Sequence, residues 1–312
     1  MFSIYGIPMG SKSVRTFLVF AVIAVQINVA WLLIARSRRK TARDNQISAQ
    51  LSSEFAAAVG EFQLDVNHLD VIEDHPPVTL TWKPYFEAIG GEITLNGSVH
   101  ISGPMRYPAE MVGRLKSTIL VSEHQSTPNL VTLETTQSFG SLRLKKGREF
   151  FPNMNVSHVS HATITADLRG KVHEYSAYVT VDGKTIESPI SVPLLFPDRA
   201  VGIGDSWGLD ENIQTSDAQR VTLAVARLSR FVEYQSIPHA VIQAEVNSTC
   251  SLKKAAAGIV ELPPDMLQKD FVDVTEKRTY LIRVGTCEVI WFEVHTDMGA
   301  LGEYTARMKQ EH

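Results

Sequence analysis

One short stretch combines residue types that could form a catalytic nucleophile. Residues 204–208 read Gly-Asp-Ser-Trp-Gly, which fits the Gly-x-Ser-x-Gly pattern of the nucleophile elbow in α/β-hydrolases. That elbow needs a strand before Ser206 and a helix after it, together with an acid and a histidine. Residues 209–219 lack the apolar face of a helix. A serine hydrolase that uses Ser206, with His239 or His295 as its base, is therefore an alternative and not the main prediction.

Three histidines lie close together in a stretch with strand-like patterning. His158 and His161 are three residues apart, so in a strand their side chains point to opposite faces and one ion cannot easily bind both. His173, on the next predicted strand, could pair with one of them across the sheet. Since no carboxylate-flanked ligand set accompanies them, we predict no metal site and no bound cofactor.

The two cysteines, Cys250 and Cys287, both fall in strand-like runs. In an oxidising compartment they could form a disulfide worth about 3–4 kcal/mol, whereas in the cytoplasm they would be free thiols. Whether the Cβ atoms lie within bonding reach depends on the fold, so the Cys250–Cys287 disulfide is a hypothesis. Two cysteines without histidines at finger spacing do not make a zinc site.

The largest single feature of the sequence is an uncharged apolar run over residues 16–35, preceded by a tail at residues 1–15. About twenty such residues match a bilayer core of roughly 30 Å. The run is longer than the core of a signal peptide, and no clean Ala-x-Ala site follows its first half. We therefore predict a retained, single-pass transmembrane helix, in which Gln26 and Asn28 either are tolerated or contact another helix.

A basic flank and an amphipathic helix are predicted over residues 36–69. Within residues 41–62, apolar side chains recur at three- and four-residue steps, which places them on one helix face. That face either packs on the domain that follows or pairs with a second copy of the chain as a short stalk. The apolar residues of this pattern are Ile47, Leu51, Phe55, Ala58 and Phe62.

The rest of the chain is patterned for antiparallel β-structure, in a first block at residues 70–194 and a second at 195–312. Alternation and turn signals predict a mainly β fold, either a sandwich or an open half-barrel. Asn96-Gly97 and Asp182-Gly183 are candidate hairpin turns. Strands are expected at residues 78–82, 92–102, 118–122, 130–136, 141–144, 156–168, 172–181 and 185–192 in the first block, and at 220–233, 239–252, 274–284, 287–295 and 303–308 in the second.

A glycine-rich turn at the start of the second block is the most distinctive motif. Glycine allows backbone conformations that other residues avoid, and the Asp and Ser side chains can bond nearby amides. We predict a structural turn, after which the tryptophan begins a strand or fills the core. The residues of this turn are Gly202, Gly204, Asp205, Ser206 and Trp207.

The turn and its surroundings resemble a known family. Residues 197–207 are similar to the Pro-x-x-x-Val-x-x-Gly-Asp-Ser/Thr-Trp signature of a family of uncharacterised bacterial envelope proteins, many of them lipoproteins. Residues 292–301 resemble the late Phe-x-x-x-x-Gly-x-Leu run of that family. The resemblance covers about residues 190–310 and implies antiparallel strands and an envelope location, but no activity. The chain differs in having no lipobox cysteine and in using a predicted membrane helix.

The side of the membrane on which the β domain lies is open. Residues 36–43 contain five basic side chains, whereas Lys12 and Arg15 precede the span. The positive-inside rule therefore favours a cytoplasmic domain, whereas the family resemblance favours an extracytoplasmic one. We give preference to the extracytoplasmic side.

Composition narrows the classes of partner. The net charge of −4 argues against a nucleic-acid-binding surface, and the one basic cluster next to the span suits lipid head groups. We therefore predict a membrane-anchored envelope protein whose β-rich domain binds or scaffolds a partner without catalysis. A protein partner or a second copy could bind through the helix at residues 41–62. The alternatives are a carrier of a lipid or other hydrophobic ligand in a half-barrel, and the serine hydrolase.

Overall fold

The computed structural model describes most of the chain after the predicted span. The predicted tail, the predicted span and the basic residues at 36–43 lie outside the described residues. Within the described part, no helix has the length and apolar character needed to cross a bilayer. The described residues are 44–310, except 103–108, 125–126, 128, 147–148, 155–157, 182–183, 188–192, 211–218, 252–270 and 300–301.

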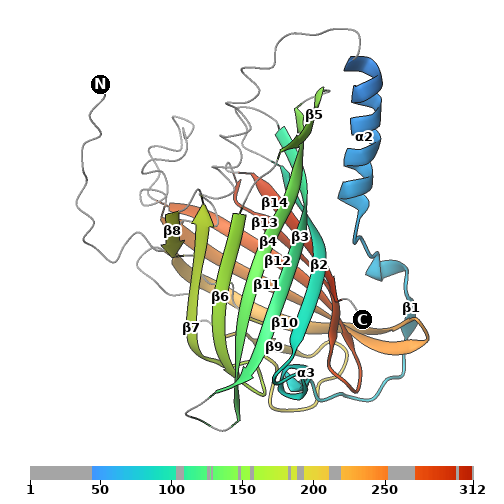
Figure 1. Cartoon of the computed structure of the whole chain (residues 1–312). Helices are drawn as coiled ribbons and strands as arrows, with labels where there is room; N and C mark the ends of the chain where they lie inside the picture. The colour runs from blue at the N-terminus through green and yellow to red at the C-terminus, as the bar shows by residue number, and fades with distance from the viewer. Residues whose placement is uncertain are drawn as a thin grey trace.

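One antiparallel sheet of fourteen strands dominates the described chain (Figure 1), which confirms the predicted mainly β fold. Its main path runs β1-β10-β11-β12-β13-β14-β2-β3-β4-β6-β7-β8, and β5 and β9 add to β4 and β10. The strands are β1 (Asp70–Ile72), β2 (Glu92–Ser102), β3 (Ala109–Glu123), β4 (Leu130–Lys146), β5 (Glu149–Met154), β6 (His158–Asp167), β7 (Val172–Val181), β8 (Lys184–Glu187), β9 (Ser206–Gly208), β10 (Gln219–Tyr234), β11 (Ile237–Ser251), β12 (Phe271–Arg283), β13 (Val289–Asp297) and β14 (Glu303–Gln310).

The last strand joins the two predicted β blocks into one sheet. β14 pairs with β2 over its whole length, from Glu303 opposite Ser102 to Gln310 opposite Leu95. β1, from the first block, also pairs with β10 of the second, and the remaining strands pair within their own block. Backbone hydrogen bonds therefore join β2, near the start of the first block, to β14, at the end of the second. The predicted boundary at residue 194/195 does not divide the sheet.

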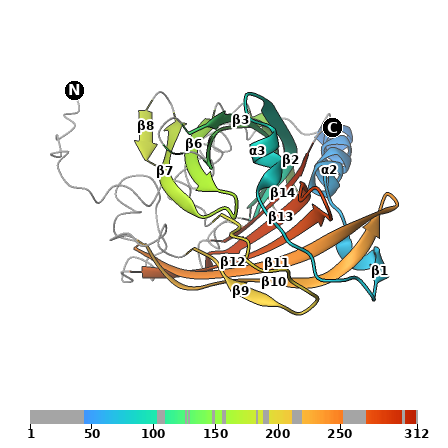
Figure 2. The same ribbon diagram turned by 90° about the horizontal axis from the view of Figure 1, so that it is seen from below.

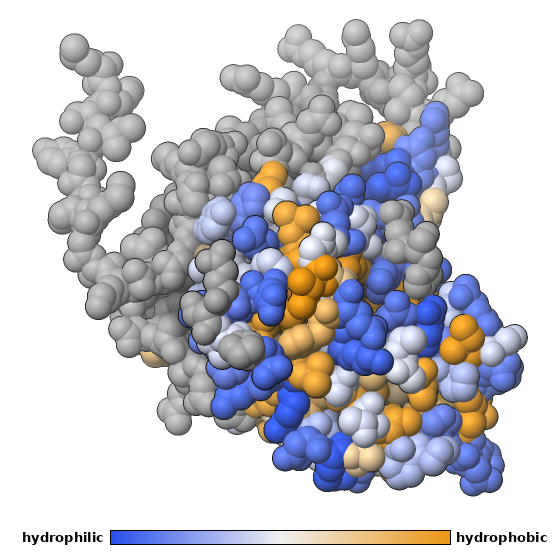
Figure 3. Space-filling model, turned by 60° about the horizontal axis from the view of Figure 1, so that its bottom comes forward, coloured by the Kyte–Doolittle hydropathy of each residue, from blue (hydrophilic) through white to orange (hydrophobic). Residues whose placement is uncertain are grey.

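The sheet is strongly curved, and its inner face encloses the main core. In Figure 2, β2, β3, β6 and β7 arch over the flatter β10–β12, and the short helix α3 (Lys83–Glu87) lies within the arch. Side chains alternate between the two faces of each strand, so every second residue enters this core. Its largest fully buried side chains include Leu80, Phe196, Leu228, Phe231 and Ile282. On the side shown in Figure 3, short groups of apolar side chains are surrounded by polar ones.

The predicted amphipathic helix is present as α2 (Asp44–Gly60), and it packs on the outer face of its own sheet. Phe55 is its buried anchor. Side chains of the sheet donate hydrogen bonds to carbonyl groups of α2 and of the two residues that follow it. Arg143 donates to the Glu54 carbonyl (2.7 Å), Arg307 to Val59 (3.4 Å), Ser98 to Glu61 (2.9 Å) and Trp291 to Phe62 (2.8 Å).

Most predicted strands are confirmed, and two local predictions are wrong. Asn96-Gly97 is not a hairpin turn but the middle of β2. The chain runs straight through because Gly97 faces the neighbouring strand, where a Cβ atom would lie 2.1 Å from the Arg307 carbonyl oxygen. Residues 78–82 form only an isolated bridge, between Val78 and Val201, before α3 begins. By contrast, β7 and β8 pair with Val181 opposite Lys184, as the Asp182-Gly183 signal predicts.

Candidate functional site

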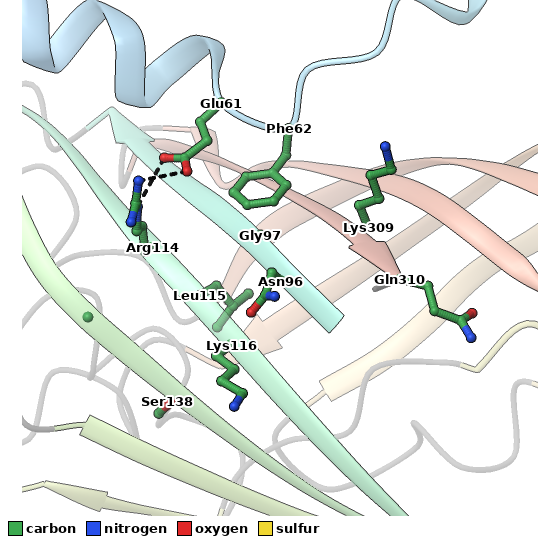
Figure 4. Close-up of a pocket in the computed structure, with 11 residues that line it drawn as sticks. Glu61, Phe62, Asn96, Gly97, Arg114, Leu115, Lys116, Ser138, Lys309 and Gln310 are labelled. Carbon is green, nitrogen blue, oxygen red and sulfur yellow. Dashed lines mark hydrogen bonds and ion pairs between the residues drawn. The ribbon is translucent and has the colours of Figure 1, made fainter. Parts of the chain in front are cut away.

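An open groove of about 750 Å³ lies on the outer face of the sheet, beside the foot of α2. Strands β2, β3, β4 and β14 form its floor, and residues 61–62, just after the helix, form one side (Figure 4). Its polar and charged lining side chains include Glu61, Asn96, Arg114, Lys116, Ser138 and Lys309.

Strand register brings the floor residues together from distant parts of the chain. Lys309 of β14 lies opposite Asn96 of β2, which lies opposite Lys116 of β3, which lies opposite Ser138 of β4. Directly opposed residues have Cβ atoms about 4.5–5.5 Å apart. The four side chains therefore form one row across the sheet, in which two lysines lie on opposite sides of an asparagine (Figure 4).

A second row, two residues along each strand, carries two more cations. Arg307 lies opposite Ser98, which lies opposite Arg114. Here the charges are compensated. Glu61 accepts from Arg114 through both carboxylate oxygens, at 2.9 and 3.2 Å, and Glu293 pairs with Arg307. Because the Arg114 side chain is 75% exposed, water screens its ion pair and the net energy is small.

The lysines of the first row have no such compensation. Lys116 and Lys309 are exposed, and neither forms an ion pair with any described residue. The groove therefore combines two uncompensated ammonium groups with the neutral hydrogen-bonding side chains of Asn96 and Ser138. Ammonium and amide donors at this spacing suit a carboxylate, sulfate or phosphate group of a ligand.

The predicted turn at the start of the second block is a hydrogen-bonded corner of the fold. Gly204 has a positive φ of 90°. A carboxylate oxygen of Asp205 accepts from the Gly202 amide (3.0 Å) and from Arg199 (2.9 Å). These two interactions, the amide first, lower the pKa of the Asp205 carboxyl. The indole of Trp207 donates to the Leu195 carbonyl (2.6 Å), so this segment holds the corner against the core.

Ser206 does not occupy a nucleophile elbow. It is exposed and belongs to the short strand β9, where it lies opposite Arg227 of β10. No helix follows directly, because β9 continues to Gly208. His239 lies opposite Val232, five residues further along β10, and His295 is on β13, three strands away from β10. The structure does not bring these three residues together.

The two cysteines are also far apart. Cys250 lies opposite Val272 near the start of β12, whereas Cys287 lies in the turn after the end of β12. That strand has 13 residues, which span about 40 Å. Cys287 is a buried free thiol whose Sγ lies 3.6 Å from the Thr79 carbonyl oxygen. The structure therefore does not support an intramolecular Cys250–Cys287 disulfide.

Two of the three histidines considered for metal binding have other partners, and the side chain of His158 lies outside the described part of the structure. A ring nitrogen of His161 bonds Thr136 (3.1 Å), and its ring stacks on Tyr178. His173 lies 3.8 Å from a carboxylate oxygen of Asp167. Among the described residues, no group of three or more His, Cys, Asp or Glu side chains is placed to hold a metal ion.

The groove was not among the sites predicted from the sequence. Lys116 and Lys309 lie just outside the strands predicted at residues 118–122 and 303–308, and only the β14–β2 pairing puts them in one row. No nearby motif marks that pairing, because it joins residues about 200 positions apart. No protein-family model matches the chain, and no curated protein matches it at a significant level of similarity. The geometry of the groove is therefore the main guide to function.

Proposed function

We propose that the chain is a single-pass, membrane-anchored binding module whose groove captures an acidic group of a partner. The observation that carries this proposal is the row Lys309–Asn96–Lys116–Ser138, in which two uncompensated cations flank a neutral hydrogen-bonding group. Exposed charges of this kind contribute mainly to association rate and partner choice. They suit reversible capture of a ligand.

Binding is a better use of this site than catalysis. Lysine, asparagine and serine side chains line the groove together with Glu61, which is already bonded to Arg114. A catalytic serine needs a base within hydrogen-bond reach, oriented by a third group. Among the described contacts, no such arrangement includes Ser138.

The anchor is part of the same proposal. α2 has 17 residues, about 25 Å of helix, and follows the predicted span at residues 16–35 after a short basic flank. Because side chains of the sheet bond carbonyl groups of α2 and of the residues just after it, the groove at its foot is held in a defined position relative to the helix. Phe55 packs on the chain's own sheet, so we assign partner binding to the groove and not to pairing of α2 between two copies.

A fluorescent hexaglutamate peptide tests the groove. Titrated into the full-length protein in lipid nanodiscs at low salt, it should bind, and affinity should fall as salt rises. Lys116→Gln and Lys309→Gln should each weaken binding about three- to tenfold. Lys171→Gln, which removes an exposed lysine on β7's side of the sheet, is the matched control and should change little. Equal effects of all three substitutions would reject the groove as the site.

A separate experiment tests the anchor and its orientation. Cys287 is buried, so a better reporter is Lys171→Cys in a background carrying Cys250→Ser and Cys287→Ser. A membrane-impermeant thiol reagent should label this position in intact cells after outer-membrane permeabilisation if the domain is extracytoplasmic. Labelling only after cell lysis would place the domain in the cytoplasm, as the basic flank suggests. Recovery of the protein in the soluble fraction would reject the anchor.

The lipid-carrier alternative receives little support from the described interior. Large side chains such as Phe196 and Phe231 fill the core, and the apolar cavity found there has a volume of about 150 Å³. Pockets for drug-sized ligands usually measure about 300–1,000 Å³. The described cavity is therefore too small for a lipid, although its wall is rich in aromatic side chains.

A further inference from the structure

The inner face of the sheet holds a cavity that the groove proposal does not use. It measures about 150 Å³ and lies between α3 and strands β2, β12 and β13. Native interiors are packed as densely as organic crystals, and voids larger than a water molecule are few. A cavity of this size in another protein, lined by apolar side chains, stays dry and binds benzene. The volume therefore suits one small apolar molecule.

Four aromatic side chains from separate segments form much of the wall. Trp82 and Tyr85, next to and within α3, have ring centroids 5.1 Å apart. Tyr280 of β12 and Phe292 of β13 have centroids 5.9 Å apart. Aromatic rings prefer other rings at tilted or edge-on geometries within 4.5–7 Å. A ring-shaped ligand would therefore find partners on both the helix side and the sheet side.

The position of Trp82 in the wall is fixed by the backbone around it. Its indole donates to the Leu194 carbonyl at 2.9 Å. Gly170, at a φ of 85°, makes room for the ring, because a Cβ there would lie 2.3 Å from the indole nitrogen. The cavity wall is thus pre-formed on this side, which lowers the cost of ordering side chains around a ligand.

Polar groups in the wall select the kind of ligand. The Tyr85 hydroxyl forms no hydrogen bond with any described residue, and burial, together with the neighbouring Tyr280, raises the pKa of Tyr85 to about 12. It therefore stays neutral and can donate to an acceptor. Glu288 is the charged residue among the described lining side chains, and it pairs with Arg283 at 2.6 Å. Because this charge is already paired and most of the wall is apolar, an anionic ligand would lose its hydration without gaining a cationic partner among the described lining side chains.

We infer that this cavity binds a small, uncharged aromatic molecule that carries one hydrogen-bond acceptor. The ring lies among Trp82, Tyr85, Tyr280 and Phe292, and the acceptor takes the hydrogen bond that the Tyr85 hydroxyl lacks. Thr81, Glu288 and Gln310 are polar lining residues and are partly exposed. This site is separate in chemistry from the groove, since it selects against the anions that the groove attracts.

Fluorine NMR of the full-length protein in lipid nanodiscs tests the inference, with 4-fluoroacetophenone and fluorobenzene as probes. Both should show a bound signal, and the ketone should bind about five- to tenfold more tightly. Tyr85→Phe should remove that difference and leave fluorobenzene unchanged. Leu95→Phe, which fills the cavity from β2, should abolish binding of both probes. Nanodiscs with Lys116→Gln protein should behave like wild type, so the two proposals fail independently.

The thiol in the cavity wall gives a second readout that does not depend on substitutions in the core. In a Cys250→Ser background, the buried Cys287 should react slowly with N-ethylmaleimide, and 4-fluoroacetophenone should slow that reaction at least a further fivefold, because the ligand covers the thiol. If neither probe gives a bound signal and alkylation is unchanged, the cavity is a packing void. Binding that survives Leu95→Phe would place the probe elsewhere and also overturn the inference.

Discussion

The two faces of the central strands differ sharply although their residues are neighbours in sequence. On β14, Met308 is 2% exposed on the inner face and Lys309 is exposed on the outer face. On β3, Leu115 is buried and Lys116 is exposed. One row of the sheet therefore belongs to the core and the next to the groove. At these positions the strands separate the apolar core on the inner face from the basic groove on the outer face.

The outer face is not uniformly polar. Apolar side chains on it pack against the residues that follow α2 and hold them on the sheet. Beyond the groove, Leu281, Ile290 and Trp291 form a second, smaller core with Val66 and Val241. Since both faces of β12 are buried there, substitutions at neighbouring positions should report on two different cores.

Leu281→Ala and Ile282→Ala compare the two cores directly. Both side chains are fully buried, Leu281 in the outer core and Ile282 in the inner one. Each substitution should lower the free energy of unfolding by about 2–5 kcal/mol, because it removes apolar contacts and leaves a cavity. Chemical denaturation measures this, with Leu120→Ala, which is 48% exposed, as the control. A cost below 1 kcal/mol for Leu281→Ala would show that the outer core is not a packed one.

Gly97→Ala tests the β14–β2 seam that joins the two halves. The added methyl group would meet the Arg307 carbonyl oxygen at 2.1 Å and the Met308 side chain at 2.9 Å. Relief of this clash requires the strands to shift, so we expect a loss of about 1–3 kcal/mol. Gly140→Ala is the matched control, since its Cβ would have its nearest contact at 3.6 Å. Equal stability of the two variants would contradict the described strand spacing.

Stability should fall as the pH drops below neutrality, in part through His239. Burial lowers the pKa of this histidine, the nearby Arg283 lowers it further, and its bond to the Ile237 carbonyl opposes the shift. The folded-state pKa lies below the unfolded value, so the unfolded chain binds more protons. The stabilisation is therefore complete above the unfolded pKa of about 6.5 and is lost as pH falls toward the folded one.

His239→Asn should flatten this dependence, since the amide stays neutral and can still donate to Ile237. Melting temperatures of both proteins between pH 7.5 and 5 provide the measurement. Some dependence should remain from His100, whose pKa burial also lowers. An unchanged slope in the variant would exclude His239 as a source of the acid sensitivity.

Glu61→Gln should have the smallest effect on stability and an opposite effect on binding. The exposed pair with Arg114 contributes at most about 1 kcal/mol. Without the carboxylate, Arg114 is available to a ligand, so hexaglutamate should bind about threefold more tightly. Glu174→Gln, which removes an exposed carboxylate on β7, should leave affinity nearly unchanged. Weaker binding in Glu61→Gln would show that Glu61 supports the site and does not compete with the ligand.

The sequence alone determined most of the segments that become strands. The second block illustrates this: residues 220–233, 239–252, 274–284, 287–295 and 303–308 were all predicted, and they correspond to β10–β14. The helix at residues 41–62 and the β7–β8 pairing were also predicted from the sequence. Alternation of apolar and polar residues and the residue types of turns are local properties, so each can be recognised within a short stretch of sequence. β1, β5 and the first half of β3 were not predicted, because their patterns are short or irregular.

Only the tertiary structure decided which strands lie side by side, and with that, what the side chains can do. Gly97 looked like part of a turn, yet it allows the close approach of β14. The same pairing places Lys309 next to Asn96 and in one row with Lys116, and it brings β2 and β13 to the same side of the cavity wall that includes Trp82. Pairing between strands about 200 residues apart depends on the packing of the whole core and leaves no local mark. The serine and cysteine motifs were visible in the sequence and remained apart in space, whereas the groove and the cavity arose from the pairing.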